Sequence, residues 1–206
     1  MTDKRRQRPD DSAFSRRSFL KGSGAAVAAT AITTQAEDAL AQQDDKQVVS
    51  GSTKITLQVN GQSHEVTVEP RTTLLEVLRD QLDLTGCKDL KDVHVDGADT
   101  VIVDGKATYA GTMLALQARG KEIRTVESLR NGDEVDEVVD GFVRHDAMQC
   151  GFCTPGFVMA TRAFLDRNPG ASLEEVRKGL GGNICRCGTY DGITQCAMEL
   201  AKKGGA

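Results

Sequence analysis

The pattern of apolar and polar residues changes its period partway along the chain. In the first half, apolar residues alternate with polar ones around Asn60-Gly61 and again around Asp104-Gly105, two pairs that favour tight β-hairpin turns. Between these turns, leucine and valine residues follow a helical spacing. The predicted elements are a hairpin at 55–68, a helix that starts at 74 and ends before Leu84, and a second hairpin at 100–109. This order predicts a small, β-rich α+β unit.

From about residue 133 the apolar residues follow the period of a helix instead. An apolar stripe runs from Val135 to Val143, and Ser172 followed by Glu175 is a capping-box signal for a later helix. The predicted helices cover residues 135–143, 157–165, a segment that starts at 172, and 193–201. Short helices of this kind pack as a bundle. The expected fold class is therefore α+β, with a β-rich domain at 53–127 followed by an all-α, four-helix domain at 133–203.

The first forty residues predict an export signal. Basic residues precede Arg16-Arg17 and a mild apolar run follows at 24–32, a pattern that resembles a twin-arginine signal. The run is shorter than the roughly 20 residues of a membrane-spanning helix, and the small residues at 39–41 fit a cleavage site. An amphipathic helix on a membrane surface is the weaker alternative, because the segment has almost no large apolar face. We expect a signal at 1–41, a linker at 42–52 and a periplasmic mature protein that is not integral to the membrane.

Length, charge and composition narrow the possible functions. A chain of 206 residues is too short for a large catalytic core with its own cofactor domains, which favours a subunit of a larger enzyme. The net charge of −4 supplies no basic field for phosphates, and aromatic residues make up only 4% of the chain. Nucleic acid is therefore not an expected partner.

Four of the six cysteines form two closely spaced pairs. Two residues separate Cys150 from Cys153, one residue separates Cys185 from Cys187, and thirty-one residues lie between the pairs. Each pair is expected where a helix begins, so free N–H groups and the positive end of the helix dipole would stabilise an anionic cluster. Four thiolates from two loops can hold a two-iron centre. We therefore predict that these four cysteines bind one [2Fe–2S] cluster.

A structural zinc site and a pair of disulfide bonds are the alternatives to a cluster at these cysteines. Zinc usually takes paired ligands two to four residues apart, and Cys185 and Cys187 are closer than that. A disulfide across one intervening residue would be strained, and thiolates already bound to iron cannot pair oxidatively. Of the remaining cysteines, Cys87 is expected to be a small buried or free thiol, and Cys196 falls on the apolar stripe of the last helix as a core residue.

Two motifs connect the chain to a known family. Residues 149–156, Gln-Cys-Gly-Phe-Cys-Thr-Pro-Gly, and 182–190, Gly-Asn-Ile-Cys-Arg-Cys-Gly-Thr-Tyr, resemble the small subunit of molybdenum hydroxylases such as xanthine dehydrogenases and aldehyde oxidoreductases. The resemblance implies a β-grasp, ferredoxin-like first domain and an electron-transfer role with no catalytic residue on this chain. It also implies a large partner subunit that holds molybdopterin, with Gln149 near the pterin. Candidates for the electron acceptor are an FAD subunit and a soluble cytochrome.

The chain departs from this family in its first domain. The family normally carries a second [2Fe–2S] cluster there, held by cysteines in Cys-x4-Cys-x2-Cys spacing and by a fourth cysteine after a hairpin. An ungapped alignment places Lys91, Asp96, Asp99 and Gly111 at those four positions. A lysine is a cation and a glycine has no side chain, so we expect only one cluster in the chain.

Two alternatives to this interpretation concern other kinds of site. The acidic and histidine residues of this loop, Asp92 and His94 among them, could hold a hard divalent ion, although a solvated loop is favoured. The whole chain could also be a non-redox structural or assembly subunit that retains its four cysteines for zinc. A zinc protein would be colourless and silent in electron paramagnetic resonance (EPR), which separates it from an iron–sulfur protein.

Overall fold

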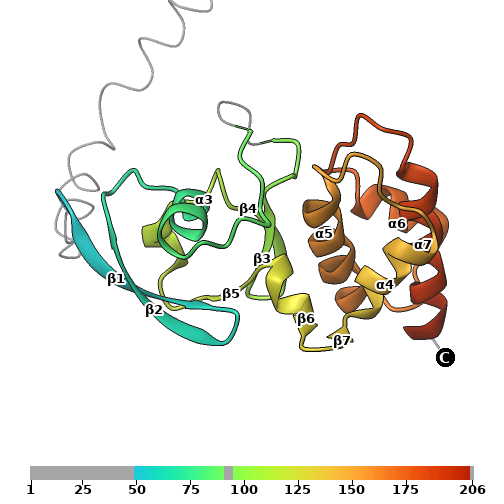
Figure 1. Ribbon diagram of the computed structural model, residues 1–206, viewed down its shortest axis with the longest axis horizontal. Coiled ribbons are helices and arrows are strands. Elements are labelled where there is room, and N and C mark those ends of the chain that lie inside the picture. The colour runs from blue at the N-terminus through green and yellow to red at the C-terminus, as the bar shows by residue number, and fades with distance from the viewer. Residues whose placement is uncertain (1–48, 91–94, 205–206) are drawn as a thin grey trace, which may run out of the picture. The chain divides into compact units, whose positions relative to one another are not determined.

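The computed structural model describes residues 49–90 and 95–204. The predicted export signal at 1–41 and most of the linker at 42–52 lie outside the described residues, as do Lys91, Asp92 and His94. The described residues fall within one unit that starts at Val49 and contains both a sheet and several helices (Figure 1). The chain is therefore a mixed α and β protein, in agreement with the predicted elements.

Five strands form one sheet in the order β2-β1-β5-β3-β4. They are β1 (Thr53–Val59), β2 (Gln62–Val68), β3 (Thr100–Val103), β4 (Lys106–Tyr109) and β5 (Glu122–Arg124). The two predicted hairpins are confirmed, since β1 pairs with β2 and β3 pairs with β4, both antiparallel. In β1 the alternation buries Ile55, Leu57 and Val59 and leaves the residues between them exposed.

The sequence pattern does not predict β5, although β5 joins the two hairpins into one sheet. This strand pairs with β1 in parallel and with β3 antiparallel. The backbone N–H of Asn60 donates to the C=O of Ile123 at 2.8 Å, and its side-chain Oδ1 accepts the N–H of Thr125 at 2.8 Å. A strand of three residues is too short to show a clear alternation, which explains why the sequence does not reveal it.

Replacing Ile123 by alanine tests the importance of β5. Loss of this fully buried side chain should lower the free energy of unfolding by about 3 kcal/mol, because the lost burial and the new cavity both destabilise the fold. Ile184→Ala is a matched control, since Ile184 is 56% exposed and its truncation should cost less than about 0.5 kcal/mol. Urea unfolding followed by circular dichroism measures both variants, and equal losses would contradict the central position of β5.

The first predicted helix is confirmed, and it ends at Gln81, before Leu84 as expected. Helix α3 (Leu74–Glu76) continues as a π-helical turn, η1 (Val77–Gln81), and Thr73 forms a capping box with Glu76 at its start. Shorter elements lead to the second half of the chain. These are η2 (Ala115–Ala118), η3 (Val126–Leu129), and a small hairpin of β6 (Arg130–Asn131) and β7 (Glu134–Val135).

The second half contains the four helices that the apolar spacing predicts. They are α4 (Glu137–Arg144), α5 (Thr154–Arg167), α6 (Leu173–Gly179) and α7 (Tyr190–Gly204). The capping box of Ser172 with Glu175 is confirmed at the start of α6. Of the helices that the structure describes, none is long and apolar enough to cross a membrane.

The first of these helices starts two residues later than its predicted range. Val135 pairs with Arg130 in the β6–β7 hairpin, and the helix begins only after Asp136, whose carboxylate accepts the N–H of Val138 at 2.9 Å. The buried face of α4 consists of Val138, Gly141 and Phe142. Val143 lies about 100° farther around the helix than its predecessor and is 74% exposed, although the stripe placed it inside.

Helices α4 and α7 are joined by polar contacts around Glu199. His145, which ends α4, places its Nε2 at 2.6 Å from a Glu199 oxygen, and Arg144 donates to both Glu199 oxygens. Hydrogen bonds from Lys203, Arg144 and His145 hold the pKa of Glu199 well below its ordinary value. The predicted core position of Cys196 is also confirmed, because this cysteine is fully buried where α7 faces α4.

The sheet half and the helical half share a packed boundary. Ile102 of β3 belongs to the same buried cluster as Phe157 of α5 and Ile193 of α7. Helix α5 lies against β3, and the turn that precedes β3 therefore comes close to the loops that carry the four cysteines (Figure 1).

Candidate metal centre

Each cysteine pair lies at the start of a helix, as the sequence predicts. Cys153 directly precedes the first residue of α5, and its C=O accepts the N–H of Phe157 at 3.0 Å. Pro155 lies in the first turn of α5, where the N–H that proline lacks would have no partner in the helix. Cys185 and Cys187 lie in the turn that leads into α7.

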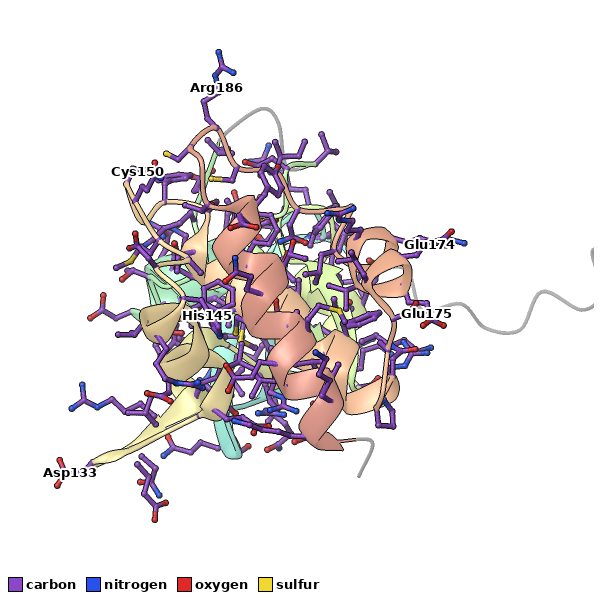
Figure 2. All side chains as sticks on the ribbon, turned by 90° about the vertical axis from the view of Figure 1, so that its right-hand side faces the viewer. Asp133, His145, Cys150, Glu174, Glu175 and Arg186 are labelled. Carbon is purple, nitrogen blue, oxygen red and sulfur yellow. The ribbon has the colours of Figure 1, made fainter. Side chains whose placement is uncertain are left out.

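The fold brings the four cysteines of the two loops close together. Cys185 neighbours both Cys153 and Cys187, and Cys187 neighbours Cys150. Cys153 and Cys185 are buried, Cys187 is half-buried and Cys150 is exposed. In Figure 2, Cys150 and Arg186 lie at the same end of the molecule, and the Arg186 side chain extends outward. The site is therefore reachable from one side and packed on the other.

The pKa values of the two buried thiols, Cys153 and Cys185, are shifted in opposite directions. Burial alone would raise the pKa of Cys185, but hydrogen bonds from the Thr189 hydroxyl at 3.1 Å, from Cys153 and from the N–H of Cys187 at 3.3 Å together lower it. Burial and the contact with Cys185 raise the pKa of Cys153 to about 12. Cys185 is thus the thiol of this pair that most readily becomes a thiolate, the form that binds metal.

Neighbouring side chains hold the two cysteine loops in place. The Tyr190 hydroxyl accepts the N–H of Cys185 at 2.8 Å, and its ring meets that of Phe157 edge-on at 5.8 Å between centroids. Gln149 is exposed, and its Oε1 accepts the N–H of Gly188 at 3.3 Å, which links the first cysteine loop to the second. Its expected place near a pterin remains a prediction.

The arrangement of the thiols bears on which metal they fit. Among the residues that the structure describes, no three histidine, cysteine or acidic side chains converge on a single metal ion. A structural zinc ion needs four ligands around one centre, each sulfur at about 2.3 Å. Four soft thiolates supplied by two loops are also the kind of ligand set that a two-iron centre takes.

The predicted loss of a second set of ligands can be followed at three of its four positions. Asp99 is buried, and its Oδ2 accepts the N–H of Gly111 at 2.6 Å, so the fold brings these two positions together. Asp96 accepts the N–H of Ala98 at 3.1 Å through its carboxylate. The fourth position, Lys91, lies outside the described residues. None of the three described residues carries a thiol.

Cys87 lies in the sheet half as a packed, buried thiol. It is 2% exposed, and its thiol donates to the C=O of Leu84 at 3.4 Å. Burial raises its pKa to about 12, with the negative charge of Glu127 as a second cause. The prediction of a small buried residue is confirmed.

Several residues that surround the cysteines have no ligand or helix signal of their own in the sequence. Thr189 and Tyr190 contact Cys185, and Asn183 and Tyr109 bind the same loop to the sheet half. Three of these residues lie within the motif at 182–190, so the available signal was a polar side chain within a few residues of a predicted ligand. Tyr109 lies 76 residues before Cys185, and the sequence carries no signal for its contact with the loop.

Comparison with known proteins places this site in a family. Residues 125–198 match the model of a [2Fe-2S] binding domain, and residues 13–33 match the model of a twin-arginine translocation signal sequence. The nicotine 6-hydroxylase small subunit of Paenarthrobacter nicotinovorans is 41% identical over 73% of this chain and 90% of its own length. The aldehyde oxidoreductase iron-sulfur-binding subunit PaoA of Escherichia coli strain K12 is 34% identical over 94% of this chain and 90% of its own length.

Solved structures agree with these relatives. Quinoline 2-oxidoreductase from Pseudomonas putida 86 contains a chain that is 38% identical and superposes with a TM-score of 0.69, over 76% of this chain and all of that one. Aldehyde oxidoreductase from Desulfovibrio gigas gives a TM-score of 0.68 at 34% identity, over 72% of this chain and 17% of that larger one.

The cysteine site and the matching domain define an iron–sulfur protein of the [2Fe–2S] type. The chain belongs to the iron–sulfur subunits of the molybdenum hydroxylases, and it is the electron-transfer subunit of such an oxidoreductase. Its twin-arginine signal sequence exports it to the periplasm.

Proposed function

We propose that Cys150, Cys153, Cys185 and Cys187 hold the single [2Fe–2S] cluster of this chain and that all electrons pass through it. The observation that carries the proposal is the convergence of the four thiols at the starts of α5 and α7, where Cys185 neighbours Cys153 and Cys187, and Cys187 neighbours Cys150. When bound, such a cluster accepts and releases one electron at a time.

The proposed partner is a large subunit that holds molybdopterin and carries out the substrate chemistry. Support comes from relatives that are named as small or iron–sulfur-binding subunits. Large apolar side chains are exposed on and around the cysteine loops, where they would suit a protein interface. These residues are Met148, Phe152, Ile184 and Tyr190. Gln149 is exposed between them in sequence, which supports its place near the pterin.

We further propose that residues 53–127 are a β-grasp, ferredoxin-like domain without a cluster and that residues 133–203 are the cluster-binding domain. The buried carboxylate of Asp99 and the N–H of Gly111 occupy two positions of the second ligand set without a thiol. Electrons would therefore leave from the same cluster that receives them, to an FAD subunit or to a soluble cytochrome. The match to a [2Fe-2S] binding domain favours this role over a non-redox subunit with zinc.

Metal analysis of the folded, full-length protein tests the proposed number of clusters. The expected result is about two irons and about two acid-labile sulfides per chain, with one EPR signal after reduction by dithionite. About four irons per chain would contradict a single cluster. A colourless protein that contains zinc would instead support the structural alternative.

The Thr189 hydroxyl is expected to tune the reduction potential of the cluster. Its hydrogen bond to Cys185 Sγ at 3.1 Å stabilises negative charge on the sulfur, which increases on reduction. Thr189→Val should lower the potential by roughly 40 mV if the bond is about 1 kcal/mol stronger in the reduced state, whereas Thr189→Ser should retain the original value. A redox titration followed by EPR measures both. Equal potentials in the valine and serine variants would argue against this role.

A further inference from the structure

The turn before β3 is hydrogen-bonded to the loop that carries Cys185 and Cys187. We call residues 96–100 the positioning turn. The N–H of Ile184 donates to the C=O of Asp96 at 2.8 Å. The Asn183 side-chain amide donates to the C=O of Gly97 at 2.9 Å and to the Thr100 hydroxyl at 3.1 Å, both in buried surroundings. One side chain of the cysteine loop thus binds two points of the positioning turn.

A second residue of the sheet half binds the same loop. The Tyr109 hydroxyl at the end of β4 donates to the C=O of Gly182. Gly182, Asn183 and Ile184 are therefore all hydrogen-bonded to the sheet half. These are the three residues that directly precede Cys185. Hydrogen bonds from the sheet half therefore hold the backbone that leads into this ligand.

The positioning turn also touches the helix that follows the other cysteine pair. A Cβ added at Gly156, in the first turn of α5, would lie 2.0 Å from the C=O oxygen of Gly97. A Cβ added at Gly97 would lie 2.5 Å from Nδ2 of Asn183, and the φ of Gly97 is +79°. Both contacts require glycine, and together they place the positioning turn against both cysteine loops.

Asp99 holds the positioning turn in its own domain. Its side chain is 1% exposed, its Oδ2 accepts the N–H of Gly111 at 2.6 Å, and its C=O accepts the N–H of Ala110 at 3.3 Å. Asp99 and Gly111 are two of the positions where the ungapped alignment places lost ligands. A bound cluster would connect these positions through iron, and in this chain a hydrogen bond connects them.

We propose that the positioning turn sets the place of Cys185, with Asp99 as the anchor of the turn and Asn183 as the side chain that transmits its position. Asp99 would then replace, as a structural link, the cluster that this half of the chain lacks. Both residues would act through the loop before Cys185 and not as ligands, so both are positioning residues. The proposal rests on the proposed function, because the place of Cys185 affects redox properties only if the four cysteines bind the cluster.

The physical consequence concerns the hydrogen bonds to Cys185. Its sulfur accepts bonds from Thr189 and from the N–H of Cys187, and its own N–H donates to Tyr190. A small displacement of residues 182–184 would change the lengths of all three bonds. Hydrogen bonds to a ligand from residues that do not bind the metal themselves orient that ligand. They also control the electronic properties and the retention of the metal.

The test uses the full-length holoprotein and four variants. Asp99→Ala removes the acceptor for Gly111, and Asn183→Ala removes the contact with the positioning turn from the other side. Both should keep two irons per chain, show shifted g values and broadened lines in the EPR spectrum, and release iron to a chelator about tenfold faster. Asp99→Asn retains an oxygen acceptor and should behave as the wild type. Asp104→Ala, which removes an exposed acid at the opposite end of β3, is the control for loss of charge.

The outcomes distinguish failure of the positioning role from failure of the proposed function. Wild-type g values and iron release in both Asp99→Ala and Asn183→Ala would overturn the positioning role and leave the proposed function intact. Equal changes in Asp104→Ala would overturn it as well, because they would indicate a general effect of charge. If Asp99→Ala fails to fold, Asn183→Ala decides the question alone. A wild-type protein without a [2Fe–2S] signal would overturn the proposed function itself.

Discussion

A variant with serine in place of Cys185 is expected to be isolated without its cluster. Cys185 is the buried thiol whose pKa is lowered by surrounding hydrogen bonds, and its backbone is fixed by Tyr190. Serine has similar size, but its hydroxyl is a harder and much more basic ligand than a thiolate and suits iron–sulfur chemistry poorly. Loss of one of four ligands should remove almost all the iron, the visible absorption and the EPR signal. Iron and sulfide analysis together with absorption spectra measures this.

Cys196→Ser provides the matched control for the loss of a cysteine. Cys196 is fully buried, and its thiol donates to the C=O of Val138 at 3.8 Å, a bond that a serine hydroxyl can also make. This variant should keep the full iron content even if it is somewhat less stable. Equal loss of iron in both variants would indicate that cysteine replacement acts through folding and not through the ligand set. Full iron content in Cys185→Ser would remove Cys185 from the site.

The elements that the sequence predicts correctly carry explicit local signals. Asn60-Gly61 and Asp104-Gly105 have positive φ angles, as tight hairpin turns require, and both hairpins form. The capping box at Ser172 likewise begins a helix. Strand β5 has no such signal, because its place depends on pairing with two strands that are distant in the sequence. The start of α4 was misplaced because Val135 continues the apolar stripe although Asp136 caps the helix after it.

In the candidate site, too, features with a local sequence signal were predictable and features that depend on tertiary contacts were not. The spacing within each cysteine pair is visible in the sequence and led to the quartet. The contacts of Asn183 with the positioning turn join residues that are 83 and 86 positions apart, and only the fold brings them together. Asp99 was recognised as the replacement of a ligand, but its hydrogen bond to Gly111 required the structure. Local chemistry is therefore predictable here, whereas the support of the ligands depends on tertiary contacts.

Gly156→Ala is expected to be strongly destabilising although it adds only one methyl group. The new Cβ would lie 2.0 Å from the C=O oxygen of Gly97 and 3.0 Å from the Cα of Ala98, and both are backbone atoms that cannot rotate away. The contact can be relieved only if the start of α5 moves away from the positioning turn. Forced repacking of a buried site of this kind should lower the free energy of unfolding by about 3 kcal/mol. The same movement would displace Cys153, so iron retention should fall together with stability.

Gly204→Ala is the control for this change, because it adds the same methyl group to a helix in open surroundings. The nearest atom to a Cβ there is Pro169 Cβ at 3.7 Å, an ordinary van der Waals distance. Alanine also favours a helix more than glycine does, so stability should be unchanged or slightly higher. Urea unfolding and iron analysis of both variants provide the comparison. Wild-type stability in Gly156→Ala would mean that α5 and the positioning turn do not pack as closely as the structure shows, and it would weaken the proposed link between the two halves.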